Sequence, residues 1–415
     1  MASSEISRRA LLGGLGALGA GIALGGAGEA LLQGSGADVG GAGAEALVPF
    51  HGEHQAGIAT PAQDRLAFGA LDVVEGASRT DLRDLLRIWT QAAERMTRGE
   101  LVGASEIPSA PPLDTGEAVG SPVGSLTITL GYGPSLFDEG RFGLASRRPR
   151  ALTQLPPLPN EALEADHCGG DICLQACSDD PLVAFHAVRN LARLGMGVVE
   201  HRWMELGFGR TSTTSTSQAT PRNLLGFKDG TRNIRAEQRE LMDRYVWVGG
   251  ETDQDWMRGG SYLVARRIRI FVENWDRDYL EDQEHVIGRF KTSGAPLAGG
   301  DGEFAVPDFR AAGQDGPVIP ADAHIRLASH ERNDGLRILR RGYSYTDGID
   351  PVRGTLLGGL FFIAFMQNPS QFVALQRKLG AHDALNEYIQ HTGSALFACP
   401  RGLEQGEHWG ERLLS

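Results

Sequence analysis

The sequence predicts an α+β protein built from two copies of a βαββαβ unit. Three observations support this class. Short apolar or alternating segments are typical of strands, and longer segments with apolar residues at i, i+3, i+4 and i+7 are typical of helices. The same order of strands and helices recurs in the second half of the chain. Finally, 415 residues with 41% hydrophobic content suffice for a large core and for two domains.

The first unit begins with a short apolar run and a helix for which Thr80 is the expected N-cap. The apolar residues of this helix share one face by their spacing: Leu82, Leu85, Leu86, Trp89, Ala93 and Met96. The unit comprises a strand at 67–74, this helix, a strand at 124–133 in which Leu126, Ile128 and Leu130 alternate, a strand at 171–178, a helix from Asp180-Pro181 to Leu194, and a strand at 198–208.

The second unit repeats this order after a Ser/Thr-rich stretch. It comprises a strand at 260–272, a helix at 276–290, strands at 337–345 and 358–367, a helix after Pro369, and a strand at 394–400. An irregular insertion at 291–336 is too long for a simple connection, and long loops inside compact domains are usually functional.

Two βαββαβ units imply two ferredoxin-like modules, each with an antiparallel sheet covered by helices on one face. Residues 209–222 contain almost no large apolar side chain, so we expect an exposed connection between the halves there. The predicted organisation is therefore an export signal at 1–44, an N-terminal module at 45–222 and a C-terminal module at 223–415.

The N-terminal segment has the pattern of a twin-arginine export signal. Arg8 and Arg9 precede an uncharged, glycine-rich segment, Ala10 to Gly28, and a small-residue cleavage site is expected near Ala42-Gly43-Ala44. The alternative is a membrane anchor, but a span needs about 20 mostly apolar residues, and glycine dilutes this segment. The sequence therefore predicts a protein of the periplasm, cell envelope or exterior, with the export machinery as a partner. This route carries folded proteins, which favours a bound cofactor.

The net charge and the cysteine spacing argue against a nucleic-acid-binding protein and against a cysteine metal site. A formal charge of −12 and no run of Lys and Arg argue against a nucleic-acid partner. Three of the four cysteines, Cys168, Cys173 and Cys177, lie close together, and the fourth is Cys399. Their spacing lacks the tight pairs typical of metal sites, so we expect packed free thiols or an opportunistic disulfide.

Three polar residues stand out as candidates for chemistry. Asp229 and Gly230 lie in the stretch GFKDGTRN, and Asp-Gly alone is first of all a turn signal. His324 lies near the end of the insertion, and Arg340 follows 16 positions later (340 − 324 = 16). Singly, each is more typical of a structural residue than of a catalytic one.

Together, these segments resemble the dye-decolourising peroxidase family, in its exported deferrochelatase/peroxidase branch. The stretch GFKDG is followed by AHIRLAS and then by RRGYSY. Further segments that resemble the family, in the same order, are FHGEHQAGIATPAQ (50–63), GGDICLQACSDDP (169–181), RWMELGFGR (202–210), GGSYLVARRIRI (259–270), VIGRFKTSGAPLAG (286–299) and GGLFFIAF (358–365). The family is built from two ferredoxin-like modules, which agrees with the order derived from periodicity.

The resemblance implies one haem b per chain, in a pocket of the C-terminal module, with His324 as the proximal iron ligand. Asp229 and Arg340 would lie on the distal face, where the glycines of GFKDG let the backbone approach the porphyrin. Leu360 and Phe362, two apart on a strand, would cover that face. Further expected haem contacts are Gly230, Thr231, Ser329 and Arg340.

Two points about the ligand remain open in the sequence. The proximal histidine usually donates its second ring N–H to a carboxylate, and both Asp383 and Glu387 are candidates. A second histidine, His330, lies six residues after His324, and His330 and Glu331 depart from the family pattern. The motif AHIRLA favours His324 as the ligand.

The implied activity is a haem peroxidase that reduces hydrogen peroxide and oxidises bulky phenols or dyes. Asp229 would move a proton between the two peroxide oxygens, and Arg340 would stabilise the negative charge that develops as the O–O bond breaks. Because a carboxylate moves the proton, an acidic rate optimum at about pH 4–5 is expected.

Two alternatives to a peroxidase remain. One is a haem-handling component of an iron-uptake system, with protein partners of that system; the other is an exported α+β protein without a cofactor. A homo-oligomer is compatible with all three.

Overall fold

The computed structural model describes residues 47–103, 108–314 and 316–415. The predicted export signal at 1–44 lies outside these residues. In the first half, strand β1 (Arg65–Val73) leads to helix α2 (Arg79–Met96), and strand β2 (Thr127–Tyr132) is followed by β3 (Ile172–Ser178). Helix α3 (Pro181–Leu194) and strand β4 (Val199–Arg210) complete this half. Its order is strand, helix, strand, strand, helix, strand.

The second half also consists of strands and helices, but several of its elements are short and interrupted. It contains α4 (Arg239–Tyr245), β5 (Ser261–Ile270), α5 (Val272–Trp275), α6 (Leu280–Ile287), α7 (His324–Ala328), β6 (Leu339–Arg340), β7 (Tyr343–Ile349), β8 (Leu356–Met366), α8 (Ser370–His382), β9 (Ile389–Cys399) and α9 (Glu411–Leu414). The predicted single helix at 276–290 is wrong, because Tyr279 has extended backbone angles and Gly288 ends α6 in the left-handed region. The predicted strand at 337–345 is likewise divided into β6 and β7.

The nine strands of the described residues belong to one sheet with the order β5-β9-β2-β3-β1-β4-β7-β8-β6, and β5 also pairs with β8. Because β5 pairs with β8, the first eight strands of this order form a closed sheet. The halves join at two short seams, where Phe208 pairs with Ser344 and Tyr132 pairs with Ala398. All pairings between these strands are antiparallel. The α+β class with antiparallel strands, predicted from the sequence, is confirmed.

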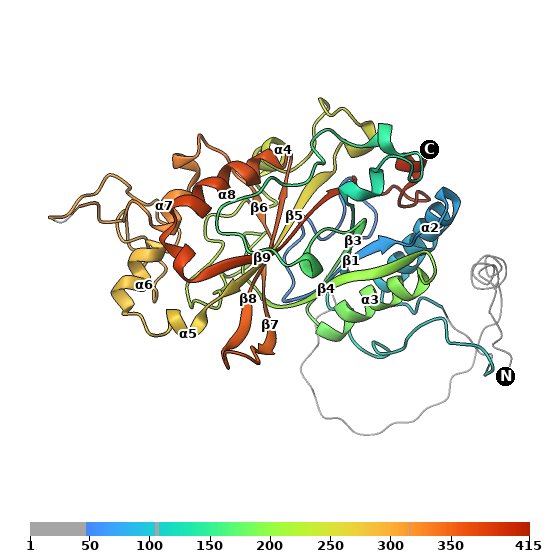
Figure 1. Ribbon diagram of the computed structural model, residues 1–415, viewed down its shortest axis with the longest axis horizontal. Coiled ribbons are helices and arrows are strands. Elements are labelled where there is room, and N and C mark those ends of the chain that lie inside the picture. Colours follow the sequence, from blue (N-terminus) through green and yellow to red (C-terminus); the bar gives the residue numbers. More distant parts are fainter. Residues whose placement is uncertain (1–46, 104–107, 315) are drawn as a thin grey trace, which may run out of the picture. The chain divides into compact units, whose positions relative to one another are not determined.

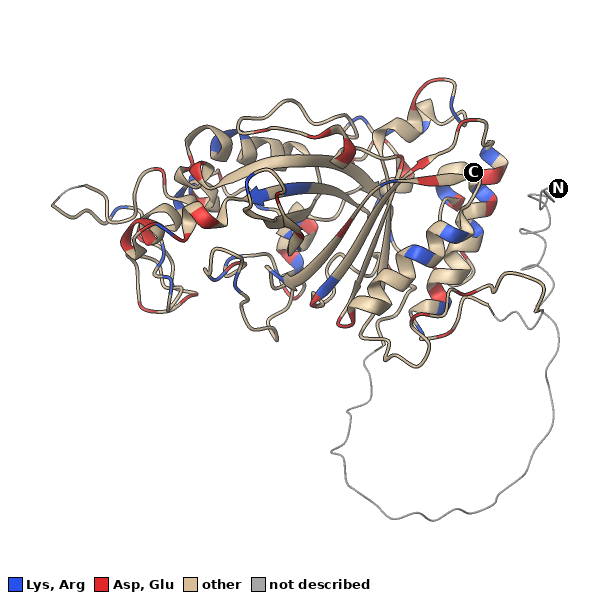
Figure 2. Cartoon of the chain, turned by 60° about the horizontal axis from the view of Figure 1, so that its bottom comes forward, with Lys and Arg blue, Asp and Glu red and all other residues tan. Residues whose placement is uncertain are grey.

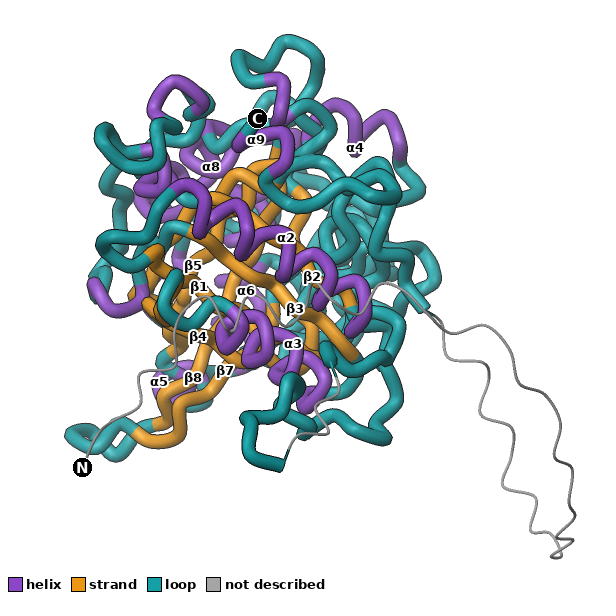
Figure 3. Tube along the Cα trace, turned by 90° about the vertical axis from the view of Figure 1, so that its right-hand side faces the viewer, coloured by secondary structure: helices purple, strands orange, loops and turns teal. Residues whose placement is uncertain are grey.

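Helices α2 and α3 cover the strands of the first half, with α3 packed on β1 and β3 (Figures 1 and 3). Helix α2 begins one residue after Ser78, whose hydroxyl accepts from the backbone N–H of Asp81 while the Asp81 carboxylate accepts from the Ser78 backbone. The expected N-cap Thr80 is therefore wrong. The reciprocal bonds of this capping box fix the start at Ser78, and Thr80 lies inside the first turn.

The exposed connection predicted at 209–222 is only partly present: residues 211–215 are all buried, whereas residues 216–222 are exposed or half-buried. Several polar groups of the buried residues bond to neighbouring segments: Thr211 N–H donates to Gly342 O, and the Thr214 hydroxyl donates to Thr60 O. Small hydroxylated side chains suit a buried backbone segment that forms hydrogen bonds with neighbouring segments. Composition alone does not distinguish this case from an exposed linker.

The four cysteines are free thiols in the structure, and Cys173, Cys177 and Cys399 are buried in the core shared by the two halves. Acidic and basic side chains are interspersed along the described chain (Figure 2). Among the described residues, no helix is long and apolar enough to cross a membrane.

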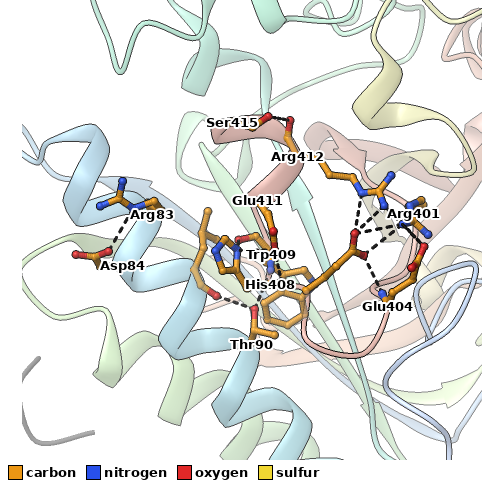
Figure 4. Close-up of polar contacts among 12 residues, drawn as sticks. Arg83, Asp84, Thr90, Arg401, Glu404, His408, Trp409, Glu411, Arg412 and Ser415 are labelled. Atoms are coloured by element: carbon orange, nitrogen blue, oxygen red, sulfur yellow. Dashed lines mark hydrogen bonds and ion pairs between the residues drawn. The ribbon is translucent and has the colours of Figure 1, made fainter. Parts of the chain in front are cut away.

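The C-terminal segment is anchored to the first half. Trp409 is buried, and its backbone N–H donates to the Thr90 hydroxyl on α2 at 2.9 Å (Figure 4). Arg401 and Arg412 pair with Glu407, and Arg401 also pairs with Glu404. This segment, which follows the last strand of the second half, therefore adds a further tie between the halves.

A buried contact between an arginine and a carboxyl group joins the two halves across the closed sheet. The Arg267 guanidinium of β5 donates to the Glu205 carboxylate of β4 at 3.0 Å and also contacts Asp347 of β7. Burial raises the pKa of Glu205 to about 7, against the opposing effect of the guanidinium. The folded protein thus holds a proton on Glu205 over a pH range in which the unfolded chain has released it.

We therefore expect Glu205 to make stability pH-dependent. Its contribution is complete below the ordinary pKa of 4.5 and is lost as the pH rises to about 7. The free energy of unfolding of the native protein, relative to Glu205→Gln, should fall by up to about 3 kcal/mol over this interval. Urea unfolding of both proteins at the two ends of the interval measures the difference, and identical pH profiles would contradict the assignment.

Candidate functional site

A cavity of about 260 Å³ is lined only by residues between Asn223 and His391. Its walls come from the loop at 223–233, the region after α6, helix α7, strands β5 and β8, and helix α8. Most lining side chains are apolar, and the charged ones are concentrated on a few segments. Every site residue predicted from the sequence, from Asp229 to Phe362, lines this cavity.

His324 is the first residue of α7, and its ring is fixed by a carboxylate. Nδ1 of His324 lies 2.6 Å from Oδ2 of Asp383, and the other Asp383 oxygen accepts from the Leu385 backbone N–H. Burial acts to lower the pKa of His324, but the Asp383 carboxylate outweighs it and raises the pKa above its ordinary value. Asp383 rather than Glu387 occupies this position, and Glu387 is outside the cavity lining.

The second ring nitrogen of His324 is left free for a ligand. Within the described part of the chain, Nε2 has no hydrogen-bond partner, and 32% of the side-chain surface is accessible at the cavity. An imidazole held at Nδ1 by a carboxylate, with Nε2 open, has the arrangement typical of a metal-ligating histidine. The arrangement suits haem iron.

Asp229 and Arg340 form an ion pair at the same cavity. Nη1 of Arg340 donates to Oδ1 of Asp229 at 2.7 Å, and the Asn223 amide donates to Oδ2 at 3.3 Å. Both carboxylate oxygens are therefore held, although Asp229 and Arg340 are 111 positions apart in the sequence. The pair is partly accessible, so a small molecule in the cavity can reach it.

An asparagine clamps the backbone that carries Arg340. Oδ1 of Asn233 accepts from Arg340 N–H at 2.9 Å, and its amide donates to Arg340 O at 2.8 Å and to Thr213 O at 2.9 Å. Asn233 thus ties β6 to the loop that carries Asp229. Sequence reasoning missed Asn223 and Asn233, although both lie within six residues of Asp229.

Strand β8 separates the cavity from the core. Phe361 and Ile363 are fully buried in the closed sheet, whereas Leu360 and Phe362 alternate with them and face the cavity. The expectation that the latter two side chains point the same way agrees with this alternation. They supply apolar surface of the kind that covers a flat aromatic ligand.

Gly230, Thr231 and Ser329 also line the cavity, and contacts within the protein already require glycine at 230. Gly230 has φ +85°, and a Cβ there would lie 2.9 Å from Ser212 Cα and 3.1 Å from Thr213 N. The buried stretch around Ser212 is therefore what excludes a side chain.

His330 lines the cavity as well, but its ring is engaged differently from that of His324. Its Nε2 lies 2.7 Å from Nη2 of Arg337, and Nδ1 lies 3.3 Å from the Glu331 carboxylate. Burial and the Arg337 guanidinium lower the pKa of His330. Both ring nitrogens have protein partners, so His330 is the weaker candidate for a metal ligand.

Comparison with known proteins decides the family. The family model described as "Dyp-type peroxidase, N-terminal" matches residues 55–209. The model described as "Dyp-type peroxidase, C-terminal" matches residues 220–404. The chain belongs to the Dyp-type peroxidase family. It is 39% identical over 374 residues to the Deferrochelatase of Escherichia coli (strain K12), covering 88% of this chain and 87% of that one.

Solved Dyp-type peroxidases have the same fold. The ferric form of DtpA from Streptomyces lividans is 40% identical with a TM-score of 0.82, and the match covers 89% of this chain and 97% of that one. The Dyp-type peroxidase of Cellulomonas bogoriensis is 37% identical with a TM-score of 0.78, covering 89% and 99%. DypB from Rhodococcus jostii, at 21% identity and a TM-score of 0.59, shows the fold alone.

The chain is therefore a haem peroxidase, and the residues of the cavity fit haem. The free Nε2 of His324 is suited to iron, Leu360 and Phe362 are suited to a porphyrin face, and the Asp229–Arg340 pair offers proton transfer and positive charge. Arg289, Arg337 and His391 also line the cavity, and no sequence motif singled them out.

Proposed function

We propose that the cavity holds haem b with His324 as the proximal ligand and with Asp229 and Arg340 on the opposite face. The proposal extends to the donors, which are bulky phenols and dye-like molecules oxidised at the expense of hydrogen peroxide. The observation that carries it is that one cavity is lined both by an imidazole with a free Nε2 and by a carboxylate–guanidinium pair. Leu360, Phe362, Gly230, Thr231 and Ser329 would contact the porphyrin.

Bound haem supplies the iron at which the peroxide is reduced and which takes electrons from the donor. Asp229 accepts a proton from one peroxide oxygen and delivers it to the other, so that the departing oxygen leaves as water. Arg340 holds the carboxylate at 2.7 Å and stabilises the negative charge that develops on the departing oxygen. Asn223 holds the Asp229 carboxylate and Asn233 holds the Arg340 backbone, so the two groups keep their relative positions.

The test of the proposed activity is direct. Haem-loaded protein is mixed with hydrogen peroxide, and oxidation of a phenol and of an anthraquinone dye is followed spectrophotometrically. Rapid turnover that is lost on removal of haem supports the proposal. Slow turnover, no faster than that of free haem, would contradict it.

A second candidate function is supported by the 39% identity to the Deferrochelatase of Escherichia coli. In this function, iron leaves bound haem, and two protons replace it on the porphyrin nitrogens. Fluorescence of the metal-free porphyrin distinguishes the two functions, because iron-containing haem does not fluoresce appreciably. Porphyrin release without added peroxide would favour the second function, with iron-uptake proteins as partners.

We also propose the domain organisation and location. The matches to the N-terminal and C-terminal family descriptions support a division near residue 222 into two ferredoxin-like modules, with the haem in the second. Export by the twin-arginine machinery to the periplasm, cell envelope or exterior would follow from residues 1–44. N-terminal sequencing of protein from the producing cells tests cleavage near Ala42-Gly43-Ala44.

The Asp383 carboxylate should be needed for tight haem binding, because it fixes the His324 ring at 2.6 Å. We expect Asp383→Asn to weaken haem binding roughly 10- to 100-fold, as is usual when the hydrogen-bond partner of a metal ligand is removed. Haem titration of the apoprotein measures the change. Glu387→Gln is the matched control and should bind haem normally; an equal loss in both variants would contradict the assignment.

A further inference from the structure

A loop of the first half is fixed against the second half beside the cavity. This loop, residues 158–164, runs next to β9, where Ala162 N–H donates to His391 O at 2.9 Å. The Glu161 carboxylate accepts from the buried Arg266 guanidinium of β5 at 2.6 Å. His391 lines the cavity, so the loop contacts the cavity wall from behind. These contacts hold the loop in one position on the second half.

Asn160 is the residue of this loop that contacts the turn after α8. Its φ is +63°, in the left-handed region that asparagine adopts more readily than most non-glycine residues. Its amide donates to Oδ1 of Asn386 at 3.0 Å and to Ile389 O at 3.1 Å. Its backbone carbonyl accepts from His391 N–H at 3.3 Å. Asn160 thus connects two segments that are 226 positions apart in the sequence.

Asn386 closes the turn after α8 with its side chain. The amide of Asn386 donates to Leu379 O at 2.8 Å and to Gly380 O at 3.1 Å, both at the end of α8. Because the oxygen of the same amide accepts from Asn160, both ends of the amide group have partners, and its orientation is fixed. A Cβ at Gly380 would lie 2.6 Å from Pro159 O, so the loop and the end of α8 are in close contact.

The turn that Asn386 closes is the one that carries Asp383. The Asp383 backbone N–H donates to Leu379 O at 2.9 Å, and its carbonyl accepts from Asn386 N–H at 3.0 Å. One carboxylate oxygen accepts from Leu385 N–H, and the other lies 2.6 Å from Nδ1 of His324. Each bond restricts where the carboxylate lies. A carboxylate that is hydrogen-bonded to an imidazole makes that imidazole a stronger metal ligand, and the effect depends on the geometry of the bond.

We propose that Asn160 is a positioning residue for the iron ligand His324. It acts through Asn386, which fixes the turn that carries Asp383. The proposal rests on the assignment of the cavity as the haem site with His324 as the ligand. The described residues of the first half do not line the cavity, but this chain of hydrogen bonds lets the first half set the strength of the imidazole as a ligand. A stronger imidazole ligand lowers the reduction potential of haem iron.

The test compares haem-loaded native protein with Asn160→Gly, Asn160→Asp, Asn386→Ala and the double variant Asn160→Gly/Asn386→Ala. Two readouts report on the imidazole: the iron–histidine stretching frequency of the ferrous protein, from resonance Raman spectra, and the haem reduction potential. Asn160→Gly removes the amide and keeps a residue that adopts positive φ. Asn160→Asp retains the size of the side chain and replaces its donor by an acceptor. Ser125→Gly is the matched control, because Ser125 also has a positive φ, +55°, and is outside the cavity lining.

We expect both Asn160 variants to lower the stretching frequency and to raise the reduction potential. The direction should be that of Asp383→Asn and the shift smaller, because the bond to His324 is misaligned and not removed. Asn386→Ala should produce at least the same shift, and the addition of Asn160→Gly to it should change neither readout further. Ser125→Gly should match the native protein. Both readouts come only from haem-bound protein, so a partly misfolded variant still reports on the ligand of its folded fraction.

Native values of both readouts in the two Asn160 variants would overturn the proposal. A full additional shift when Asn160→Gly is added to Asn386→Ala would also overturn it, because Asn160 would then act by another route. These results are separable from failure of the haem site itself. If His324 is not the ligand, Asp383→Asn leaves both readouts unchanged, whereas failure of the Asn160 assignment alone leaves the shift of Asp383→Asn intact.

Discussion

His324→Ala is expected to abolish the Soret band of protein loaded with haem and to remove peroxidase activity. The reason is that Nε2 of His324 is an uncommitted ring nitrogen at the cavity, and its Nδ1 is fixed by Asp383. Loss of the ligand should weaken haem binding by more than the roughly 10- to 100-fold typical of losing an outer hydrogen-bond partner. Haem titration followed by absorbance measures the change.

His330→Ala is the matched control for this experiment. His330 also lines the cavity, but Arg337 and Glu331 occupy its two ring nitrogens. We expect the variant to keep a normal Soret band. If His330→Ala lost the band and His324→Ala kept it, the iron ligand would be His330 and the proximal face would have to be reassigned.

Replacement of the distal pair should slow the reaction with peroxide while leaving haem bound. Asp229→Asn removes the group that transfers the proton, for which a loss of roughly 10²- to 10⁴-fold is usual. Arg340→Leu removes charge stabilisation, for which a loss of about 10²- to 10³-fold is usual. Stopped-flow mixing of each haem-loaded variant with hydrogen peroxide gives the two rate constants and shows which residue dominates.

Asp308→Asn, at an exposed carboxylate outside the cavity lining, is a control and should react at the native rate. The Soret band of each distal variant checks that haem is still bound. A native rate in both Asp229→Asn and Arg340→Leu would mean that the protein moves the peroxide proton by another route.

The sequence predicted the first half of the fold more closely than the second. The strands of the first half have alternating apolar residues, and its helix at Leu82 to Met96 has a regular apolar face. Such patterns are local in the sequence and predict these elements directly. In the second half, the predicted helix at 276–290 is shortened by Tyr279 and Gly288, which lie at the two ends of α6. Their backbone conformations do not change the spacing of the apolar residues, so the apolar pattern does not reveal these ends. The exposed hairpin after Tyr345 has no apolar alternation to indicate it.

The pairing of the two halves into one sheet could not be predicted. The seams at Phe208–Ser344 and Tyr132–Ala398 depend on strands far apart in sequence, and periodicity carries no information about which strands meet. The burial of residues 211–215 follows from the same tertiary packing. It explains why Gly230 is required and why a Ser/Thr-rich composition was misleading.

The candidate site was indicated mainly by family resemblance, because single residues such as Asp229 or His324 carry weak signals. The structure adds what the motifs lack, which is the choice of Asp383 over Glu387 and the clamps by Asn223 and Asn233. These residues had no distinctive spacing. The role of Asn233 is visible only when segments more than a hundred positions apart are brought together, and Asp383 meets His324 across 59 positions.

A crystal structure of the haem-loaded protein tests the account most directly. It should contain haem in the cavity between α7 and β8, with iron bound by Nε2 of His324 and with Asp229 and Arg340 over the opposite face. Iron bound by His330 or by another side chain, or Asp229 and His324 on the same face of the porphyrin, would contradict it.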